Sequence, residues 1–200
     1  GFGRDLEGWW HLSITPVAFV LAAASATLFV EISWIIWAVQ LLCVGFVFFF
    51  LEHLFRFIHL PGIYQPYALE HTSLVLHVAT MYGLSLSLFG LQIFLPAPGW
   101  LLALLFFVMA TMLVYETLWV SKVRDTTAVH VASIGGVLLT ELFVTLSLLP
   151  LSFYVNAAVL ATCFYMVLGL VRAEATQKLS SGLLRHHVVL GLVLIVLLLL

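Results

Sequence analysis

The chain has 200 residues, of which 64% are hydrophobic and 8% are charged. A soluble domain carries about 45–50% apolar and about 25% charged residues, so this composition excludes a soluble protein and predicts an integral membrane protein. The formal net charge of −2 is too small to favour nucleic acid as a partner, and the lipid bilayer is the expected surrounding.

The apolar residues fall into long runs without polar alternation. Such runs predict helices, because the strands of a membrane barrel are only about ten residues long and alternate in polarity. Short segments separate the runs, so we expect an all-α, polytopic transmembrane helix bundle of about seven spans that occupies residues 1–200 as a single domain. The predicted spans are residues 13–30, 33–58, 67–95, 99–121, 127–149, 152–171 and 183–200.

Turn-forming residues mark most breaks between the runs, namely Pro61-Gly62, the segment Pro96–Gly99, and Pro150. The first break, near Glu31, has no proline and is placed there because the surrounding apolar stretch is too long for one crossing. The last run is unusual, because residues 188–200 give only about 20 Å of uninterrupted apolar helix, against a hydrocarbon core of about 30 Å.

All seven lysines and arginines fall on one side of the membrane when the chain is threaded through these spans. Because Lys and Arg in loops mark the cytoplasmic face, the threading predicts an N-inside, C-outside protein, which we place in the cytoplasmic membrane of a bacterium. Tryptophans fall at both predicted boundaries, as is typical of the membrane–water interface. The basic residues are Arg4, Arg56, Lys122, Arg124, Arg172, Lys178 and Arg185.

Acids and histidines inside the runs form the candidate functional site, a polar layer in the inner half of the membrane. A charged side chain near the bilayer centre costs about 2.5–3.5 kcal/mol on insertion scales. Lipid offers no partner, so we expect these side chains to face one another or a wet cavity. The predicted binding or pathway residues are Glu52, Arg56, Glu70, His77, Glu116, His130 and Glu141.

Several of these residues also have a simpler explanation. Glu52 and Arg56 are spaced i, i+4 and would form an ion pair at a helix end. Glu70 opens its helix, where an acid suits the positive end of the helix dipole. His77 and Glu141 lie deeper, and an interhelical hydrogen bond is the alternative to a functional role for them.

A metal site is a further hypothesis, with His77 and His130 as candidate ligands of a divalent metal. The chain has no HExxH, GxGxxG or Walker A motif, so zincin-type catalysis and nucleotide binding are unsupported. Cys43 and Cys163 lie well inside apolar runs and are expected to be packing residues rather than ligands.

Residues 149–156 (LPLSFYVN) lead into the sixth run, and residues 169–172 (GLVR) end it. These segments resemble a family of multi-spanning membrane proteins of small-genome bacteria. The resemblance implies an uncharacterised family and brings no activity or site residue with it.

Three functions therefore remain open. The polar layer favours a small transport-type or ion/solute-binding protein. The first alternative is a structural or accessory subunit of a larger membrane complex, whose polar residues bond across helices, to other membrane proteins or to a second copy of the chain. The second alternative is a metal-dependent, lipid-modifying enzyme with a histidine-bound metal and a Glu as base, and enzymatic activity is the least favoured of the three.

Overall fold

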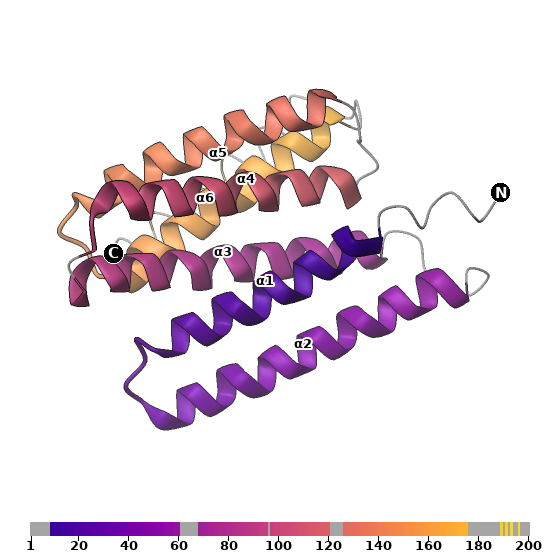
Figure 1. Ribbon diagram of the computed structural model, residues 1–200, viewed down its shortest axis with the longest axis horizontal. Helices are drawn as coiled ribbons and strands as arrows, with labels where there is room; N and C mark the ends of the chain where they lie inside the picture. The colour runs from indigo at the N-terminus through magenta and orange to yellow at the C-terminus, as the bar shows by residue number, and fades with distance from the viewer. Residues whose placement is uncertain are drawn as a thin grey trace.

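The computed structural model describes residues 9–60, 68–95, 97–120 and 126–175, together with Val189, Gly191, Val193 and Val196. All regular structure in these residues is helical, so the all-α prediction is confirmed. Six helices follow one another in alternating directions (Figure 1). They are α1 (Trp9–Thr27), α2 (Ser33–His59), α3 (Ala68–Phe94), α4 (Gly99–Val120), α5 (Thr126–Ser147) and α6 (Phe153–Ala175).

Five of these helices, α2 to α6, are long and apolar enough to cross a membrane. The protein is therefore an integral membrane protein. The predicted number of about seven spans is not supported by the described residues. The apolar part of α1, Ser13–Thr27, is shorter than a full span, and the predicted run 183–200 lies outside the described residues apart from four helical positions.

Exposed tryptophans mark one end of the bundle. Trp34 and Trp37 lie in the first turns of α2 and Trp100 in the first turn of α4, and each is more than 70% exposed. Both helices begin at the same end of the molecule (Figure 1). Tryptophan side chains gather at membrane–water interfaces, so this end is one of the two membrane boundaries.

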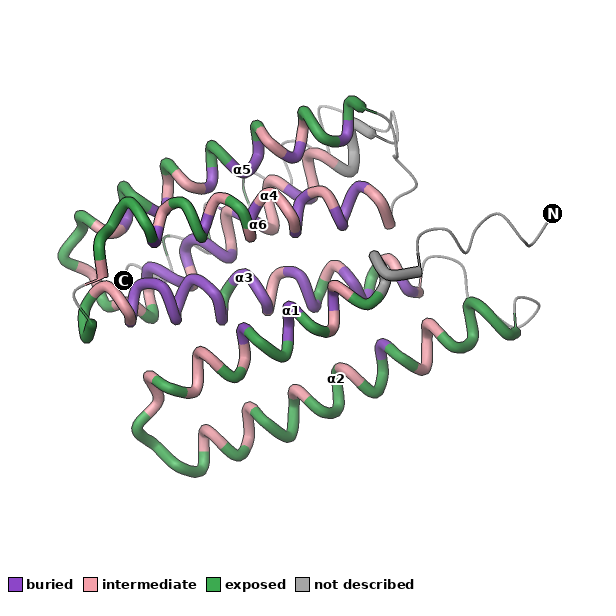
Figure 2. Tube along the Cα trace, viewed as in Figure 1, coloured by how far each residue is buried: buried purple, intermediate pink, exposed green. Residues whose placement is uncertain are grey.

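Helix α3 forms the centre of the bundle and contacts α1, α2, α4 and α6. In the most apolar 18-residue stretch of α3, 67% of the residues are buried, against 6% in that of α2. Figure 2 shows the same contrast along the two helices. Helix α2 is therefore peripheral. Its one fully buried residue, Phe50, packs with Phe19, Leu69 and Leu76.

Small residues allow α1 and α3 to lie close together in parallel. A Cβ atom added to Gly83 would lie 3.0 Å from the carbonyl oxygen of Ala22, and one added to Gly90 would lie 2.7 Å from the ring of Phe29. The two contacts have the same sequence separation, so the helices keep one register along their length. Close backbone approach of this kind drives helix association in membranes, where apolar surface alone gives no preference for a neighbouring helix.

Helices α4 and α5 are also joined at a glycine. A Cβ added to Gly136 would overlap Oγ1 of Thr111, whereas one added to the adjacent Gly135 would lie 3.6 Å from the nearest atom, on Val114. Farther along the same helices, the ring of Phe143 stacks between Phe106 of α4 and Phe89 of α3. The packing face of α5 is thus defined by its glycines and Phe143.

Replacing Gly136 by alanine is expected to lower the free energy of unfolding by about 1–3 kcal/mol, the usual cost of overpacking. Rotation of the Thr111 hydroxyl does not relieve the contact, because Thr111 Cβ would still lie 3.1 Å from the new methyl group. Unfolding by SDS titration in mixed micelles measures the change. Gly135→Ala is the matched control and should stay within about 0.5 kcal/mol of the wild type; equal losses for both variants would contradict this packing of α4 on α5.

Candidate functional site

The imidazole of His77 joins three helices in the interior. Its side chain is 0% exposed. Nε2 lies 3.0 Å from Oγ1 of Thr15 on α1, and Nδ1 lies 2.8 Å from Oγ1 of Thr117 on α4. His77 itself belongs to α3, so the ring is a polar junction between α1, α3 and α4.

The hydroxyl of Thr117 decides which ring nitrogen carries the proton. Thr117 donates its only hydroxyl hydrogen to the carbonyl oxygen of Leu113, at 2.9 Å, so its oxygen must accept a hydrogen bond from Nδ1–H of His77. An uncharged imidazole has one donor and one acceptor nitrogen; Nε2 is then the acceptor, and Thr15 donates to it. Every polar atom of the junction is satisfied without water or a ligand.

Most other hydroxyls on the buried face of α3 are satisfied within the helix. Thr72, Thr80 and Ser85 each donate to the carbonyl oxygen four residues earlier, at 2.6–2.9 Å. Such bonds leave no demand for an external partner. Within the described residues, Ser73, one turn before His77, has no hydrogen-bond partner for its buried Oγ.

A second polar contact lies farther along α1 and α3. Ser87 and Ser25 are hydrogen-bonded through their hydroxyls at 2.8 Å. The sequence separation is 62, the same as that between Thr15 and His77. The two contacts therefore belong to the register that also brings Gly83 against Ala22.

Of the predicted acids, Glu116 is the one that lies inside the bundle beside this junction. It precedes Thr117 on α4 and is 1% exposed. Glu70, in the first turn of α3, is half-buried. Neither carboxylate is without a partner.

The remaining predicted site residues point away from the junction. Glu52 and Arg56 form the i, i+4 ion pair at 2.5 Å on the exposed side of α2. His130 and Glu141 are exposed on α5. The structure thus bonds His77 to two threonines and buries Glu116 next to Thr117 in sequence. Glu70 is half-buried, and the other predicted residues lie on outward faces.

Thr15 and Thr117 were not among the predicted residues. Threonine in an apolar helix usually donates to its own backbone, so its identity does not reveal a contact with another helix. A weak signal was present, since Thr117 directly follows Glu116, the one acid of its predicted run.

The candidate metal ligands do not form part of a larger ligand set in the described structure. Both nitrogens of His77 are bonded to threonines, and His130 is exposed on another helix. Among the described residues, no group of three or more His, Cys, Asp or Glu side chains is arranged to hold a metal ion. Metal binding by His77 would require it to leave a threonine partner.

Glu141 lines a hollow of about 540 Å³ on the outer face of α4 and α5. Phe107 of α4 forms one wall, and Val137, Thr140, Val144 and Thr145 of α5 form the rest. This hollow has polar side chains in its lining. It is on the surface that an isolated chain would expose to lipid.

Residues 4–200 match the family model DUF5656, described as a protein of unknown function. The chain belongs to the DUF5656 family. The prediction of an uncharacterised family is confirmed, whereas the bacterial origin is not tested by this match. No curated protein and no solved structure matches the chain.

Replacing Thr117 by valine is expected to lower the free energy of unfolding by about 0.6–1.7 kcal/mol, the range measured for interhelical hydrogen bonds in membranes. The substitution keeps the shape of the side chain but leaves Nδ1–H of His77 without an acceptor. Unfolding in mixed micelles measures the loss. Thr80→Val is the control, because Thr80 is equally buried and bonds only its own helix; a larger loss for Thr80→Val would contradict the role given to His77.

Proposed function

We propose that this DUF5656 member is an accessory subunit that assembles with a different membrane protein through the outer face of α4 and α5. One observation carries the proposal: Glu141 is exposed within a membrane-spanning helix. Among the described residues, no hydrogen bond or ion pair reaches its carboxylate.

The depth of Glu141 makes contact with lipid costly. It lies six residues before the end of α5 at Ser147, about 9 Å along the helix axis. Its exposed neighbours Val137, Leu138 and Val144 are apolar. An acid at the bilayer centre costs about 2.5–3.5 kcal/mol on insertion scales; at its depth Glu141 bears part of that cost, which a hydrogen-bond donor on another helix would lower.

The hydrogen bonds around Glu141 specify the chemistry of the partner. Thr140 donates to the carbonyl oxygen of Gly136 at 2.7 Å, and Thr145 donates to that of Glu141 at 2.8 Å. With both hydroxyl hydrogens used, the hollow presents acceptors. The complementary group is a donor within a membrane helix: a guanidinium, ammonium, imidazole or amide side chain.

A second copy of the chain does not supply that donor. Two copies with the same orientation in the membrane, related by a two-fold axis along its normal, would bring one Glu141 against the other, and like charges repel. His130, on the same outward stripe of α5, lies eleven residues away, about 16 Å along the axis. It cannot reach Glu141 of a symmetric partner, so we assign the face to a different chain.

A transport-type or ion/solute-binding role is the second candidate. The burial of Glu116 beside His77 favours it. The bonding of both His77 nitrogens to threonines weighs against it, because a pathway needs polar groups that are open to the passing ion. The metal-dependent enzyme ranks third, since it requires ligands that the described residues do not group.

We further propose that the end of the bundle at which α1 starts faces the cytosol of a bacterium. Arg56 and Arg172 lie in the last turns of α2 and α6, and these helices end where α1 begins (Figure 1). Loop Lys and Arg residues favour the cytoplasmic face.

Cysteines introduced at Lys122 and Lys178 are expected to react with an impermeant maleimide from the cytosolic side of inverted vesicles and not from the outside of intact cells. The background is a chain with Cys43 and Cys163 replaced by alanine. Cysteine at Trp100 is the control and should show the opposite sidedness. Reaction of positions 122 and 178 from opposite compartments would overturn the orientation.

Glu141→Leu is expected to reduce the association with the partner about tenfold, because an interhelical hydrogen bond in a membrane contributes up to about 1.7 kcal/mol and about 1.4 kcal/mol corresponds to one decade in affinity. A photo-reactive residue at Leu138 captures the neighbouring chain in native membranes, and the yield of the cross-link is the measurement. Glu141→Gln should keep part of the yield, and Glu52→Gln, on α2, all of it.

The captured chain should carry a donor side chain within a membrane span. A self-dimer as the product, or a yield that Glu141→Leu leaves unchanged, would overturn the assembly proposal. If vesicles containing the chain alone conduct protons or another cation, and Glu116→Gln abolishes that conductance, the transport reading replaces it.

A further inference from the structure

Helix α2 is attached to the bundle mainly through its second half. Phe50 is fully buried among Phe19, Leu69 and Leu76. By contrast, none of the first 17 residues of α2, residues 33–49, is buried. This part of α2 therefore packs only loosely on α1, through the partly buried Cys43 and Val47 and the edge-to-face contact of Phe46 with Phe19.

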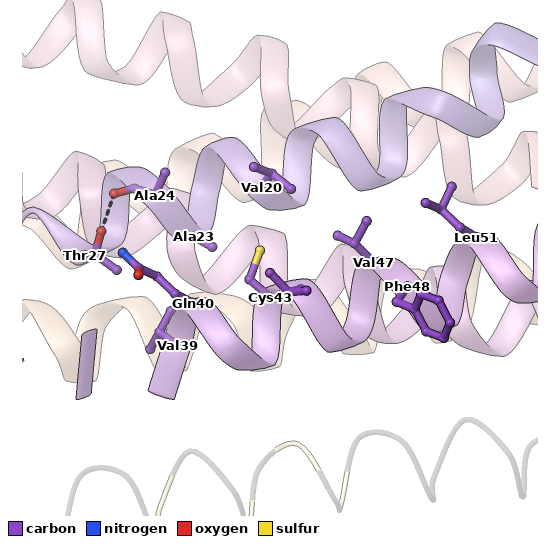
Figure 3. A pocket seen from close by; sticks show the side chains of 11 residues that line it. Val20, Ala23, Ala24, Thr27, Val39, Gln40, Cys43, Val47, Phe48 and Leu51 are labelled. Carbon is purple, nitrogen blue, oxygen red and sulfur yellow. Dashed lines mark hydrogen bonds between the residues drawn. The ribbon is translucent and has the colours of Figure 1, made fainter. Parts of the chain in front are cut away.

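Two hollows with shared lining residues form a furrow between the two helices, and Figure 3 shows the larger one. A hollow of about 580 Å³ extends from Gln40 to Leu51 on α2, and a second of about 430 Å³ continues to Leu54. The two share Val20, Val47 and Leu51 in their linings. From Gln40 to Leu54 this α1–α2 furrow is about 21 Å long.

Small side chains on α1 keep the furrow open. Ala22 packs against Gly83 of α3, so this part of the alanine run serves helix contact. Ala23 and Ala24 instead line the furrow, across from Gln40 and Cys43 of α2 (Figure 3).

The furrow is long compared with its volume. Its larger hollow holds about 580 Å³ and extends about 18 Å from Val39 to Leu51. A single hydrocarbon chain fits this shape, and the furrow's flanks, including the exposed Leu21 and Val44, adjoin the bilayer that supplies such chains.

One end of the furrow carries polar groups. Gln40 and Thr27 lie there, with the Gln40 side chain directed toward α1 (Figure 3). Thr27 donates to the carbonyl oxygen of Ala24 at 2.7 Å. Among the described residues, no hydrogen bond engages the amide of Gln40, so its two N–H groups remain available as donors.

The depth of Gln40 suits the ester group of a phospholipid. It lies seven residues after the start of α2 at Ser33, about 10 Å along the axis. A 27-residue helix is about 40 Å long and extends about 5 Å beyond a 30 Å hydrocarbon core at each end. Gln40 is then about 5 Å below the boundary, and its side chain can reach the level of the ester carbonyls.

We propose that the α1–α2 furrow binds one acyl chain of a bilayer phospholipid, with the amide of Gln40 donating to its ester carbonyl and the chain lying along Cys43, Val47 and Leu51. The site is independent of the Glu141 face, which lies on α4 and α5. A phospholipid held in this furrow differs from the other lipids around the protein, which exchange freely with the bilayer.

Native mass spectrometry of the full chain, purified in detergent with a fixed amount of palmitoyl-oleoyl phosphatidylglycerol, tests this proposal. The wild type should retain one lipid. Ala23→Phe and Val44→Trp, which fill the furrow from its two walls, should abolish retention. Ala103→Phe, at a half-buried position of α4 outside the furrow, is the matched control and should keep it.

Gln40→Leu, measured against the ester lipid and an ether-linked analogue that has no carbonyl group, tests the polar contact. Loss of one hydrogen bond of about 1 kcal/mol should lower retention of the ester lipid about fivefold and leave retention of the ether lipid unchanged.

Equal lipid loss for the furrow variants and Ala103→Phe would overturn the site, as would retention that neither furrow variant alters. A bound fatty acid or detergent in place of the phospholipid would overturn the ligand assignment. Circular dichroism of each variant identifies misfolding, and Val44→Trp keeps the test decisive if Ala23→Phe does not fold, because Val44 is already exposed.

Discussion

Hydrocarbon offers no hydrogen-bond partner, so polar side chains inside this bundle find their hydrogen bonds with one another or with the backbone. The junction of Thr15, His77 and Thr117 satisfies that constraint with a chain of bonds that ends on the carbonyl of Leu113. Because each hydroxyl has one hydrogen to donate, the bonds have a single consistent direction. The ring consequently holds α1, α3 and α4 together at one depth, and the packing of the central helix is built around it.

The same junction sets the register of α1 on α3. Polar contacts separated by 62 residues, Thr15 with His77 and Ser25 with Ser87, flank the close approach of Gly83 to Ala22. A shift by one residue would remove all three contacts together. Polar specificity and glycine packing therefore reinforce one arrangement, while α2, which takes part in neither, remains at the periphery and leaves the furrow beside α1.

Much of the fold followed from simple features of the sequence. The length of the apolar runs predicted the helical class, Pro98 directly precedes the start of α4 at Gly99, and the spacing of Glu52 and Arg56 predicted their ion pair. The side of α5 that packs against its neighbours could not be predicted from the sequence. Helical phase places Glu141 and Gly136 about 140° apart but does not say which of them meets a neighbour. In the structure Gly136 packs against Thr111 of α4. Glu141, on another side of α5, therefore lies outward. Thr15 and Thr117 also escaped prediction, because a threonine that bonds another helix looks in sequence like one that bonds its own backbone.

The parallel pairing of α1 with α3 has a consequence for how the protein is made. The partners of Thr15 and Ser25 lie 62 residues later in the chain, which at about 5–20 residues per second takes the ribosome about 3–12 s to synthesise. During that interval Thr15 and Ser25 have no partner on another helix, because His77 and Ser87 have not yet been synthesised. Helix α2 follows α1 into the bilayer but brings no polar partner for either residue. Helix α1 can therefore complete its packing only after α3 has been synthesised, although α2 comes between them in the sequence.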